Sequence, residues 1–548
     1  MKIADYIVHC LKRCGTTDVF GIPGGVILDL LYAFDAAKPK LTPHLMYHEQ
    51  DAGFAACGYA QASGKLGVAY ATKGPGFTNL ITAIAEAYYE SIPVLFITAH
   101  SSDVVEGMRT MADQEMDTCA MAEKITKYAM RLDNTETFVE DFGKAVNTCL
   151  SGRRGPVLLD ISAALWKQEV EAFETSVEEN VIKDKIDYTE VARLIREAKR
   201  PVIMAGDGIV QASAQDAFCE MVAKMDIPVI SSRATHFLLA GDPHYMGYIG
   251  SHGMRSANFV LAKADLIITI GNRMHYPVQS KSFGEAMNLK KVLRFEVDPT
   301  EFRREIPNSK TYVIDAKELI SDMLNGGYDY GNHAEWNRVC DRIRVELNDT
   351  DCESPIPEIA SIIRCMPLNS VVTCDVGNHE MLVSRALAWA DSQHKTIYSK
   401  AFGALGNALG KAIGAYYATH KPILCFAGDQ GLQMNSQELQ YIAQHQLPIT
   451  VVVMNNEKSG MIYEREMARY DHAVHTSRDS GYGHPNWGKV AHAYGMDCRQ
   501  LVDLNFTTPA IAELCYQQEQ IPYIPQGACC QDMEPQLDRE LFNTLNAL

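Results

Sequence analysis

The chain has 548 residues, more than one hydrophobic core supports, so we expect two or three domains. Hydrophobic residues make up 47% and charged residues 22%, a mixture typical of soluble globular proteins. The net charge of −18 disfavours nucleic acid and anionic membrane surfaces as partners. No apolar run reaches the roughly 18 residues that span a bilayer, so we expect no membrane partner.

The N-terminal segment MKIADYIVHCLKRCG has the pattern of an amphipathic helix, whereas a signal peptide would need an unbroken apolar region. The fifteen cysteines stand apart from one another, except for the neighbours Cys529–Cys530, whose geometry is poor for an ordinary disulfide. Both features indicate a cytoplasmic protein with reduced thiols.

Short apolar segments alternate with helix-like segments along the whole chain, which is typical of βαβ units and parallel sheets. The predicted strands fall into three series, which lie at 66–72, 92–98 and 156–161; at 201–206, 227–231, 264–271 and 291–298; and at 370–377, 422–429 and 448–456. An acidic stretch without apolar periodicity (167–187) and a second low-order stretch (325–335) separate the series. We therefore expect three doubly wound α/β domains, at 1–170, 186–330 and 350–548.

A glycine-containing turn follows one strand of the third series. PILCFA is predicted to be the strand, Gly428-Asp429-Gln430-Gly431 the turn, and MNSQELQYIAQHQ a continuing helix. Such a turn presents backbone N–H groups to an anion, but Asp429 would repel a phosphate unless a cation lay between them. The next strand ends at Asn455-Asn456, 27 positions after Asp429, and parallel strands end at the same edge of a sheet. A carboxylate, a carboxamide oxygen and a backbone carbonyl there would suit Mg²⁺ bound to a diphosphate.

The segment GDQGLQMNSQELQYIAQHQLPITVVVMNNEKSGM resembles the motif by which one enzyme family binds thiamine diphosphate. The resemblance implies that Asp429, Asn456 and the carbonyl of Lys458 hold Mg²⁺. The family usually has Gly, Ser or Ala at the third position, so Gln430 is a departure. The cofactor-binding residues implied for this part of the chain are Gly428, Asp429, Gln430, Gly431, Asn456, Lys458, Gly460 and Met461.

A carboxylate stands far upstream, after the apolar segment HLMY. The segment HEQDAGFAACGYAQASG resembles the acetolactate-synthase segment that carries the essential glutamate, here Glu49. The resemblance implies that Glu49 shares a proton with a ring nitrogen of the aminopyrimidine and thereby promotes loss of the thiazolium C2 proton. A glutamate at this position could also be only a partner of the helix dipole. Its coincidence with the distant GDQG and Asn-Asn pair favours the catalytic role.

Other segments match the same acetolactate-synthase-like family in the same order. GIPGG (21–25) resembles the loop near the reacting carbon, and KGPGFTNLITAIAEAYYESIPVLFITA (73–99) resembles a GPG…TN block. The resemblance implies catalytic roles for Gly24, Gly25 and Gln114. DVGNHEM (375–381) implies that Asn378 and His379 bind the diphosphate. AFGALGNALGKAIGA (401–415) implies that Gly403 contacts the aminopyrimidine and that Leu405 keeps the cofactor bent.

The family resemblance also implies the architecture, namely a pyrimidine-binding domain, a central domain and a diphosphate-binding domain. It implies active sites between subunits of a homodimer or homotetramer, with Glu49 of one chain serving the cofactor bound by Asp429 of another. FAD remains open, because AGDG (205–208), IGSHG (249–253) and GNR (271–273) resemble parts of the family's FAD site, yet glycine loops are common in α/β folds.

Several positions depart from those of acetolactate synthases that bind a second 2-keto acid. Arg273 is retained, but Pro277 aligns with the arginine that meets the acceptor carboxylate. Ala163–Ala164 lie near the position of the family's lysine, Asp113 replaces a phenylalanine, and Arg465 replaces a tryptophan. A carboxylate that docks without a cation is poorly compensated. The donor half of the site therefore looks retained, and the acceptor half looks changed.

These departures favour a lyase or carboligase dependent on thiamine diphosphate and Mg²⁺. It would decarboxylate a 2-keto acid such as pyruvate and transfer the acyl anion to an aldehyde or a keto-sugar. If Lys73, Arg109 or Arg465 replaces the lost cation, the protein would be a true acetolactate synthase.

The sequence is also compatible with two simpler functions. A simple 2-keto-acid decarboxylase would protonate the acyl anion, and His48 and His100 are the nearest candidates for that proton transfer. A non-catalytic regulatory paralogue would keep only the fold. Because Glu49, Asp429 and Asn456 are all present, the sequence disfavours a non-catalytic role.

Overall fold

The computed structural model describes residues 1–101, 114–171, 183–250, 252–275, 290–348, 354–517 and 539–547. Pro277, Asp113, Arg109 and the Cys529–Cys530 pair therefore lie outside the described residues. The chain forms two compact units. Unit 1 comprises Met1–Asn180, Met366–Glu380 and His394–Gln517, and unit 2 comprises Val181–Cys365, Met381–Gln393 and Gln518–Leu548.

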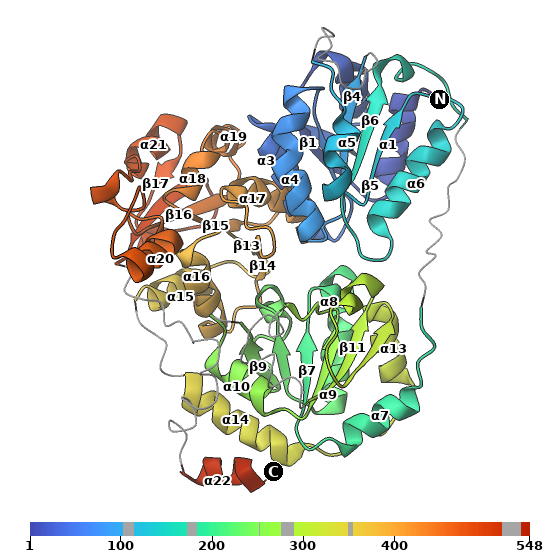
Figure 1. Ribbon diagram of the computed structural model, residues 1–548. Coiled ribbons are helices and arrows are strands. Elements are labelled where there is room, and N and C mark those ends of the chain that lie inside the picture. The colour runs from blue at the N-terminus through green and yellow to red at the C-terminus, as the bar shows by residue number, and fades with distance from the viewer. Residues whose placement is uncertain are drawn as a thin grey trace. The chain divides into compact units, whose positions relative to one another are not determined.

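Unit 1 contains two parallel sheets of six strands, flanked by helices (Figure 1). The first sheet has the order β2-β1-β3-β4-β6-β5. Its strands are β1 (Asp18–Gly21), β2 (Thr42–Leu45), β3 (Gly67–Tyr70), β4 (Val94–His100), β5 (Tyr128–Leu132) and β6 (Val157–Ser162). The helices around it are α1 (Ile3–Arg13), α2 (Leu28–Ala36), α3 (Glu49–Ser63), α4 (Pro75–Tyr89), α5 (Thr118–Ala122) and α6 (Phe138–Leu150). Strand β4 is buried along its whole length, as a strand covered on both faces should be.

The second sheet of unit 1 repeats the strand order of the first. Its order is β14-β13-β15-β16-β18-β17, so in both sheets the first strand lies between the second and the third. The strands are β13 (Val371–Cys374), β14 (Lys395–Ile397), β15 (Ile423–Gly428), β16 (Ile449–Asn455), β17 (Asp497–Cys498) and β18 (Ala510–Cys515). The helices are α17 (Asn407–Thr419), α18 (Gly431–Met434), α19 (Glu438–Gln444), α20 (Gly460–Tyr470) and α21 (Trp487–Tyr494), together with α16 (Asn378–Trp389), which begins in unit 1 and belongs to unit 2 from Met381 onward.

Unit 2 contains the third parallel sheet, with the order β12-β11-β10-β7-β8-β9. The strands run outward in both directions from β7 and β10, which is the doubly wound arrangement of nucleotide-binding folds. They are β7 (Pro201–Ala205), β8 (Val229–Ser231), β9 (Tyr245–Tyr248), β10 (Leu266–Ile270), β11 (Lys291–Glu296) and β12 (Ser309–Val313). The helices are α7 (Tyr188–Glu197), α8 (Gly208–Gln211), α9 (Gln215–Met225), α10 (Arg255–Lys263), α13 (Ala316–Asn325), α14 (Ala334–Asn348), α15 (Ile356–Arg364) and α22 (Arg539–Ala547).

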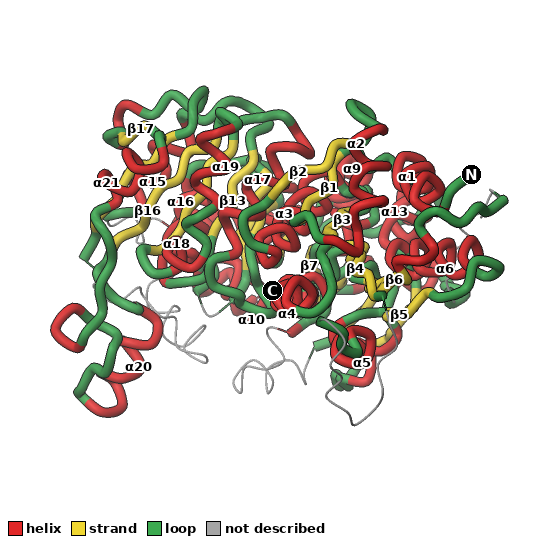
Figure 2. The backbone as a smooth tube through the Cα atoms, turned by 90° about the horizontal axis from the view of Figure 1, so that it is seen from above, coloured by secondary structure: helices red, strands yellow, loops and turns green. Residues whose placement is uncertain are grey.

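Every strand predicted from the three apolar series is present, and the α/β fold with three parallel sheets is confirmed. Figure 2 shows strands of these series, among them β3, β4, β13 and β16, between helices. The continuous helix predicted after the GDQG turn is wrong, since α18 ends at Met434 and α19 begins only at Glu438. The break lies at Asn435, whose backbone leaves the helical region (φ −133°, ψ 29°) while its side chain donates to the carbonyl of Gly406 at 3.0 Å.

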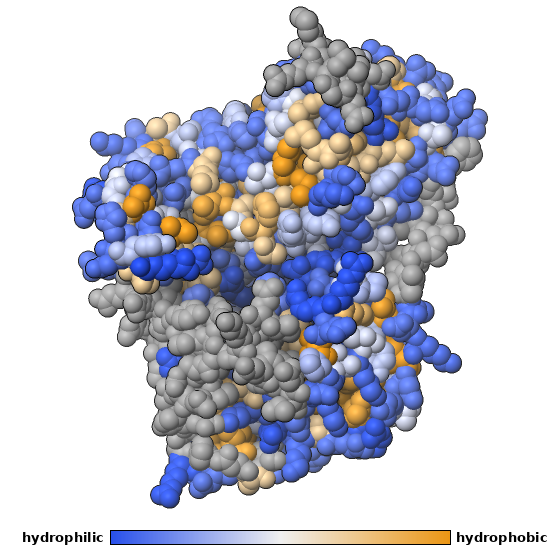
Figure 3. All heavy atoms as spheres, in the orientation of Figure 1, coloured by the Kyte–Doolittle hydropathy of each residue, from blue (hydrophilic) through white to orange (hydrophobic). Residues whose placement is uncertain are grey.

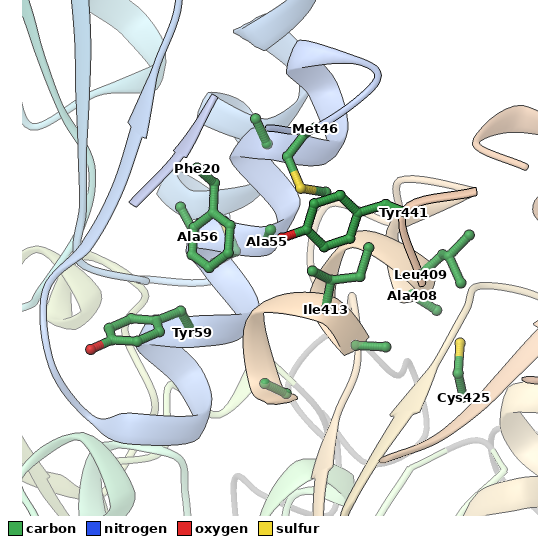
Figure 4. Packing of buried hydrophobic residues seen from close by; sticks show 14 of the residues in the cluster. Phe20, Met46, Ala55, Ala56, Tyr59, Ala408, Leu409, Ile413, Cys425 and Tyr441 are labelled. Atoms are coloured by element: carbon green, nitrogen blue, oxygen red, sulfur yellow. The ribbon is translucent and has the colours of Figure 1, made fainter. Parts of the chain in front are cut away.

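The two sheets of unit 1 share one hydrophobic core, which α3 and α17 cross in close contact (Figure 4). Both helices are rich in Ala and Gly, and residues 51–60 of α3 are all buried. An added Cβ at Gly414 would lie 1.8 Å from the carbonyl oxygen of Ala55, and one at Gly58 would lie 2.2 Å from that of Lys411. The small residues therefore let the two helix backbones touch, which larger side chains would prevent.

Candidate active site

The GDQG turn and the Asn455-Asn456 pair meet at one edge of the second sheet of unit 1. Strands β15 and β16 pair in parallel with Gly428 opposite Met454, so Asp429 and Asn455 follow directly at the same edge. This arrangement is the one predicted from the parallel strand ends. The structure thus brings the predicted metal-binding segments together.

The Asp429 carboxyl group is buried, and its two oxygens differ. Oδ1 accepts a hydrogen bond from the backbone N–H of Gln430 at 3.0 Å, whereas Oδ2 accepts no hydrogen bond within 3.5 Å from the described residues. Burial raises the pKa of this carboxyl group, although the Tyr482 hydroxyl and the Gln430 N–H oppose the shift. A buried carboxylate oxygen without a donor is costly unless a cation binds it. Asp429 therefore fits a metal ligand.

The segment after β16 supplies neutral oxygens beside Asp429. The Asn456 side-chain oxygen accepts a hydrogen bond from the N–H of Lys458 at 3.2 Å, which fixes a tight turn. The Lys458 ammonium lies 4.4 Å from the centre of the Tyr463 ring on α20, the helix that starts at Gly460 and Met461. No cluster of three or more His, Cys, Asp or Glu residues in the described chain could hold a metal. One carboxylate with amide and carbonyl oxygens is instead the set that Mg²⁺ accepts when substrate oxygens and water complete its shell.

The His379 side chain lies beside the GDQG turn, at the start of α16. An added Cβ at Gly428 would lie 3.1 Å from His379 Cε1, so glycine lets the imidazole approach. Burial lowers the pKa of His379 to about 4, which makes the ring neutral at pH 7, and Nε2 has no hydrogen-bond partner among the described residues. The neighbouring Asn378 donates to Glu464 Oε1 at 3.0 Å. The His379 imidazole thus lies beside the turn that would hold the diphosphate, with Nε2 not yet engaged by the described residues.

Glu49 begins α3 at the carboxyl edge of the first sheet of unit 1. The preceding His48 caps the helix, because its Nδ1 accepts the N–H of Gln50 at 3.1 Å. Glu49 Oε2 accepts a hydrogen bond from the Asn79 side chain on α4 at 2.9 Å. The helix cap fixes the backbone at Glu49, and the hydrogen bond from Asn79 fixes its carboxylate. The orientation of the Glu49 side chain is therefore defined.

Three further predicted residues gather around the segment that follows β3. An added Cβ at Gly24 would lie 2.3 Å from the Thr72 side chain, and one at Gly74 would lie 2.7 Å from the carbonyl oxygen of Gln114. Gln114 itself has a positive φ of 60°. Gly25 begins a short 3₁₀ helix, and an added Cβ there would meet nothing within 4 Å. Glycine at positions 24 and 74 is thus required by close packing, and Glu49, Gly24 and Gln114 share one edge of the sheet.

The segment before α17 carries Gly403 and Leu405. Gly403 has a φ of +74°, and the Leu405 side chain is 37% exposed, which leaves a bulky apolar group facing outward. The backbone N–H of Gly406 donates to Asp375 at 3.0 Å. Burial raises the pKa of Asp375 to about 7, although hydrogen bonds from Val376 and Gly406 oppose the shift.

Several residues at this site were not predicted from the sequence. Glu438 on α19 accepts hydrogen bonds from the N–H groups of Tyr47 and His48, at 2.8 and 3.0 Å, and so holds the turn before Glu49. The buried pair of Lys411 and Glu86 was also missed. Its signal was visible, since Lys411 is the one charged residue in the small, apolar segment AFGALGNALGKAIGA and needs a buried partner.

Only some of the residues considered for binding the acceptor substrate lie in the described part of the chain. Lys73 Nζ lies 2.6 Å from Glu115 Oε1 and 2.7 Å from Ser101 Oγ, so its charge is already paired. Burial opposes ionisation of Glu115, but the hydrogen bonds from Lys73 and Ser101 outweigh it and lower its pKa. Ala163 and Ala164 lie in a short 3₁₀ helix after β6.

Both histidines considered for proton transfer already make hydrogen bonds within the protein. His100 Nε2 lies 2.7 Å from Asp133, and burial lowers the pKa of His100 less than its hydrogen bonds to Asp160 and Asp133 raise it. His48 caps α3 through Nδ1. Both side chains have structural roles here.

Comparison with known families assigns each part of the chain. Residues 1–121 match the N-terminal TPP binding domain of thiamine pyrophosphate enzymes, residues 188–323 match their central domain, and residues 375–521 match their C-terminal TPP binding domain. The fold and the matched domains define an enzyme that uses thiamine diphosphate.

Similar curated proteins narrow the class. The acetolactate synthase isozyme 2 large subunit of Escherichia coli K12 is 31% identical over 507 residues, which cover 90% of each chain. The isozyme 1 large subunit of the same organism is 30% identical and covers 97% of each chain. A probable acetolactate synthase large subunit of Methanocaldococcus jannaschii is 29% identical, with 96% of this chain and 91% of the relative covered. The chain belongs to the acetolactate-synthase-like family of enzymes that depend on thiamine diphosphate.

Among the helices of the described residues, none has both the length and the apolar character needed to span a membrane.

Proposed function

We propose that the protein decarboxylates a 2-keto acid, with pyruvate as the first candidate, and joins the resulting acyl unit to a second carbonyl compound. The observation that carries this proposal is the buried Asp429 oxygen that accepts no hydrogen bond within 3.5 Å from the described residues, next to the Asn456–Lys458 turn. When bound, thiamine diphosphate supplies the electron sink for decarboxylation. Asp429, the Asn456 amide oxygen and the Lys458 carbonyl would hold Mg²⁺, and His379 would contact the diphosphate. Glu49 would hold the proton shared with the aminopyrimidine.

A second molecule of 2-keto acid is the first candidate acceptor. The relatives named above are acetolactate synthases over 90% or more of their length, which favours the same product here. This proposal replaces the sequence-based preference for an aldehyde or a keto-sugar as the leading one. It requires a cation for the acceptor carboxylate, and the exposed Arg465 on α20 is a candidate.

A neutral acceptor is the second candidate, and a specific observation favours it. Lys73 is a buried cation that is already paired with Glu115 and Ser101, and the residues at 163–164 are alanines. A carboxylate in a desolvated pocket needs a cation, whereas an aldehyde or a sugar carbonyl does not.

Product analysis separates these candidates. The protein with Mg²⁺ and thiamine diphosphate is incubated with pyruvate alone and with pyruvate plus a panel of aldehydes and keto-sugars, and carbon dioxide and products are measured. Acetolactate formed at low pyruvate concentration supports the first acceptor, and a mixed product formed much faster than acetolactate supports the second. Carbon dioxide and acetaldehyde without any ligated product would contradict the proposal and favour a simple decarboxylase.

We also propose a homodimer or homotetramer with sites shared between chains. Groups of apolar side chains lie on the visible face of unit 1 (Figure 3), and large ones that are exposed include Tyr47, Tyr89, Phe402, Leu405 and Met434. Exposed apolar patches near a site are typical of interfaces. Sedimentation at several concentrations tests the assembly, and a stable monomer with full activity would contradict it.

FAD binding is a separate proposal that the glycine loops do not require. An added Cβ at Gly206 would lie 2.1 Å from the carbonyl oxygen of Gly271, and Asn272 donates to the Ala205 carbonyl at 3.1 Å. Packing between these loops already explains the glycines. The absorption spectrum of the purified protein, with and without added FAD, decides whether a flavin binds.

A further inference from the structure

The segment 398–407 carries two residues assigned to the cofactor, yet part of what holds it comes from the N-terminal domain. Glu90, directly after α4, accepts hydrogen bonds through Oε1 from the N–H groups of Lys400, at 2.6 Å, of Ala401, and of Phe402, at 3.4 Å. The Glu90 side chain is 2% exposed. A buried carboxylate that accepts several backbone N–H groups fixes their orientation strongly, because such bonds are charge-assisted.

A second carboxylate on α4 reaches the same segment through a serine. Glu86 Oε2 accepts a hydrogen bond from Ser399 Oγ at 2.7 Å, and Ser399 Oγ in turn accepts the N–H groups of Gly403 and Ala404, at 2.9 and 3.2 Å. Glu86 Oε1 lies 2.5 Å from the Lys411 ammonium, which also donates to the Tyr398 carbonyl at 3.1 Å. Two successive hydrogen bonds, Gly403 N–H to Ser399 Oγ and Ser399 Oγ to Glu86, thus connect the backbone of Gly403 to α4.

Apolar contacts join the same two parts of the chain. Ala404 packs in a small buried cluster with Phe54 of α3 and Ala83 of α4. The rings of Tyr89 and Phe402 stack with centroids 5.5 Å apart and planes 6° apart. The segment is therefore held on one side by α3 and α4 and on the other by Asp375 and Asn435.

Glu49, by contrast, accepts a hydrogen bond from Asn79 within its own domain and, by the proposed function, serves a cofactor bound by the partner chain. We propose that Glu86 and Glu90 are positioning residues for the cofactor segment of their own chain. The inference rests on the proposed function. One N-terminal domain then serves two active sites, with Glu49 at the partner's cofactor and with Glu86 and Glu90 at the cofactor bound by its own chain.

Binding of the cofactor gives the first test. Glu90→Ala removes the acceptor for three backbone N–H groups, and we expect the affinity for Mg²⁺–thiamine diphosphate, measured by calorimetry, to fall ~10- to 100-fold. Glu90→Gln, which keeps one acceptor oxygen, should recover part of the affinity. Glu140→Ala, which removes an exposed carboxylate from α6 of the same domain, is the matched control and should bind normally. Unchanged affinity in Glu90→Ala would overturn the proposal, as would an equal loss of affinity in the control.

Mixing of chains with different tags gives the second test, because it distinguishes action within a chain from action between chains. The reference pair is Glu49→Gln with Asp429→Ala, which retains one intact site of two and about half the wild-type activity if sites are shared. Failure of this pair would contradict the shared site itself, and not the role of Glu90.

The decisive pairs place Glu49→Gln and Glu90→Ala on different chains or on one chain, at a cofactor concentration that leaves Glu90→Ala largely empty. On different chains, the two changes fall on the same site, so the other site is intact and about half the activity remains. On one chain paired with a wild-type chain, each site carries one change and activity is nearly lost. The proposal would be overturned if the pair with both changes on one chain were the more active one while the reference pair kept about half the activity.

Discussion

The Lys411 ammonium lies 2.5 Å from Glu86 Oε1, and both side chains are completely buried between α17 and α4. Burial opposes the charge of Lys411, but Glu86 and Glu90 outweigh it and raise its pKa, so the lysine stays protonated. A buried pair of this kind stabilises little relative to apolar residues, but loss of one partner leaves a buried charge alone. The pair therefore makes the contact between the two domains specific.

Removal of one partner should destabilise unit 1. We expect Lys411→Met to lower the free energy of unfolding by about 3 to 5 kcal/mol, because Glu86 then remains buried without a cation. The double variant Lys411→Met with Glu86→Gln should recover most of this loss. Urea denaturation measures both, and a single variant as stable as the wild type would contradict the assignment.

Substitution of the proposed metal ligands should reduce cofactor affinity by different amounts. Asp429→Ala should weaken Mg²⁺–thiamine diphosphate binding ~100-fold or more, since it removes the anionic ligand of a hard cation. Asn456→Ala removes a neutral ligand and should weaken binding ~10-fold. Calorimetry with Mg²⁺ present compares the two variants, and unchanged affinity in Asp429→Ala would remove the metal from this turn.

Glu49→Gln should separate binding from chemistry. The amide keeps the size of the side chain but cannot share a proton in the same way, so we expect cofactor affinity to stay near normal. Exchange of the C2 proton of the bound cofactor should slow ~1000-fold or more. Exchange followed by NMR after mixing with deuterated water measures this step, and fast exchange in the variant would exclude Glu49 as the activating acid.

Glu438 should make stability depend on pH. Burial raises its pKa from the ordinary 4.5 to about 8, although the N–H groups of Tyr47 and His48 oppose the shift. Between these two values the folded chain keeps a proton that the unfolded chain has lost, so the free energy of unfolding falls as pH rises. Asp375, with a pKa of about 7, adds to the same trend.

Glu438→Gln should flatten this dependence between about pH 5 and pH 8, because the amide does not titrate. Urea denaturation at a series of pH values compares the variant with the wild type. An equal slope in both proteins would show that other groups cause the dependence.

The close contact of α3 and α17 predicts a strong effect of one methyl group. Gly414→Ala places a Cβ 1.8 Å from the Ala55 carbonyl, which the backbone cannot avoid without moving, and should destabilise the protein by about 3 kcal/mol. Gly483→Ala, where a Cβ meets nothing within 4 Å, should change stability by less than ~0.5 kcal/mol. Thermal unfolding of both variants tests the difference.

The parallel sheets and the metal-binding edge could be predicted from the sequence because their signals are local. Strands β15 and β16 are continuous apolar runs that end in polar residues, and both features can be read without knowledge of neighbours. The edge strands β5, β12 and β17 are not predicted, since they are partly or wholly exposed and lack apolar runs. The mostly buried strands β1, β9 and β18 are also absent from the predicted series. The repeated strand order of the two sheets in unit 1 also has no signal in the sequence pattern.

Residues that act across the two domains could not be predicted for a different reason. Glu86, Glu90 and Glu438 each bond to groups about 300 or more positions away, and nothing near them in the sequence indicates that partner. A glutamate on a helix is usually solvated, so its default interpretation is a surface charge. Of these buried charges, only Lys411 predicts a buried counterion from the sequence, because it is the one charged residue in an apolar segment.

Backbone contact between α3 and α17 also limits how such enzymes can be recombined. A chimera that joins the N-terminal domain of one relative to the C-terminal domain of another would bring together two helix surfaces that had been fitted separately. A single alanine in place of Gly58 or Gly414 in either parent would then keep the helices apart. Crossover points that carry α3 and α17 together from the same parent should give folded hybrids far more often than crossovers that divide them.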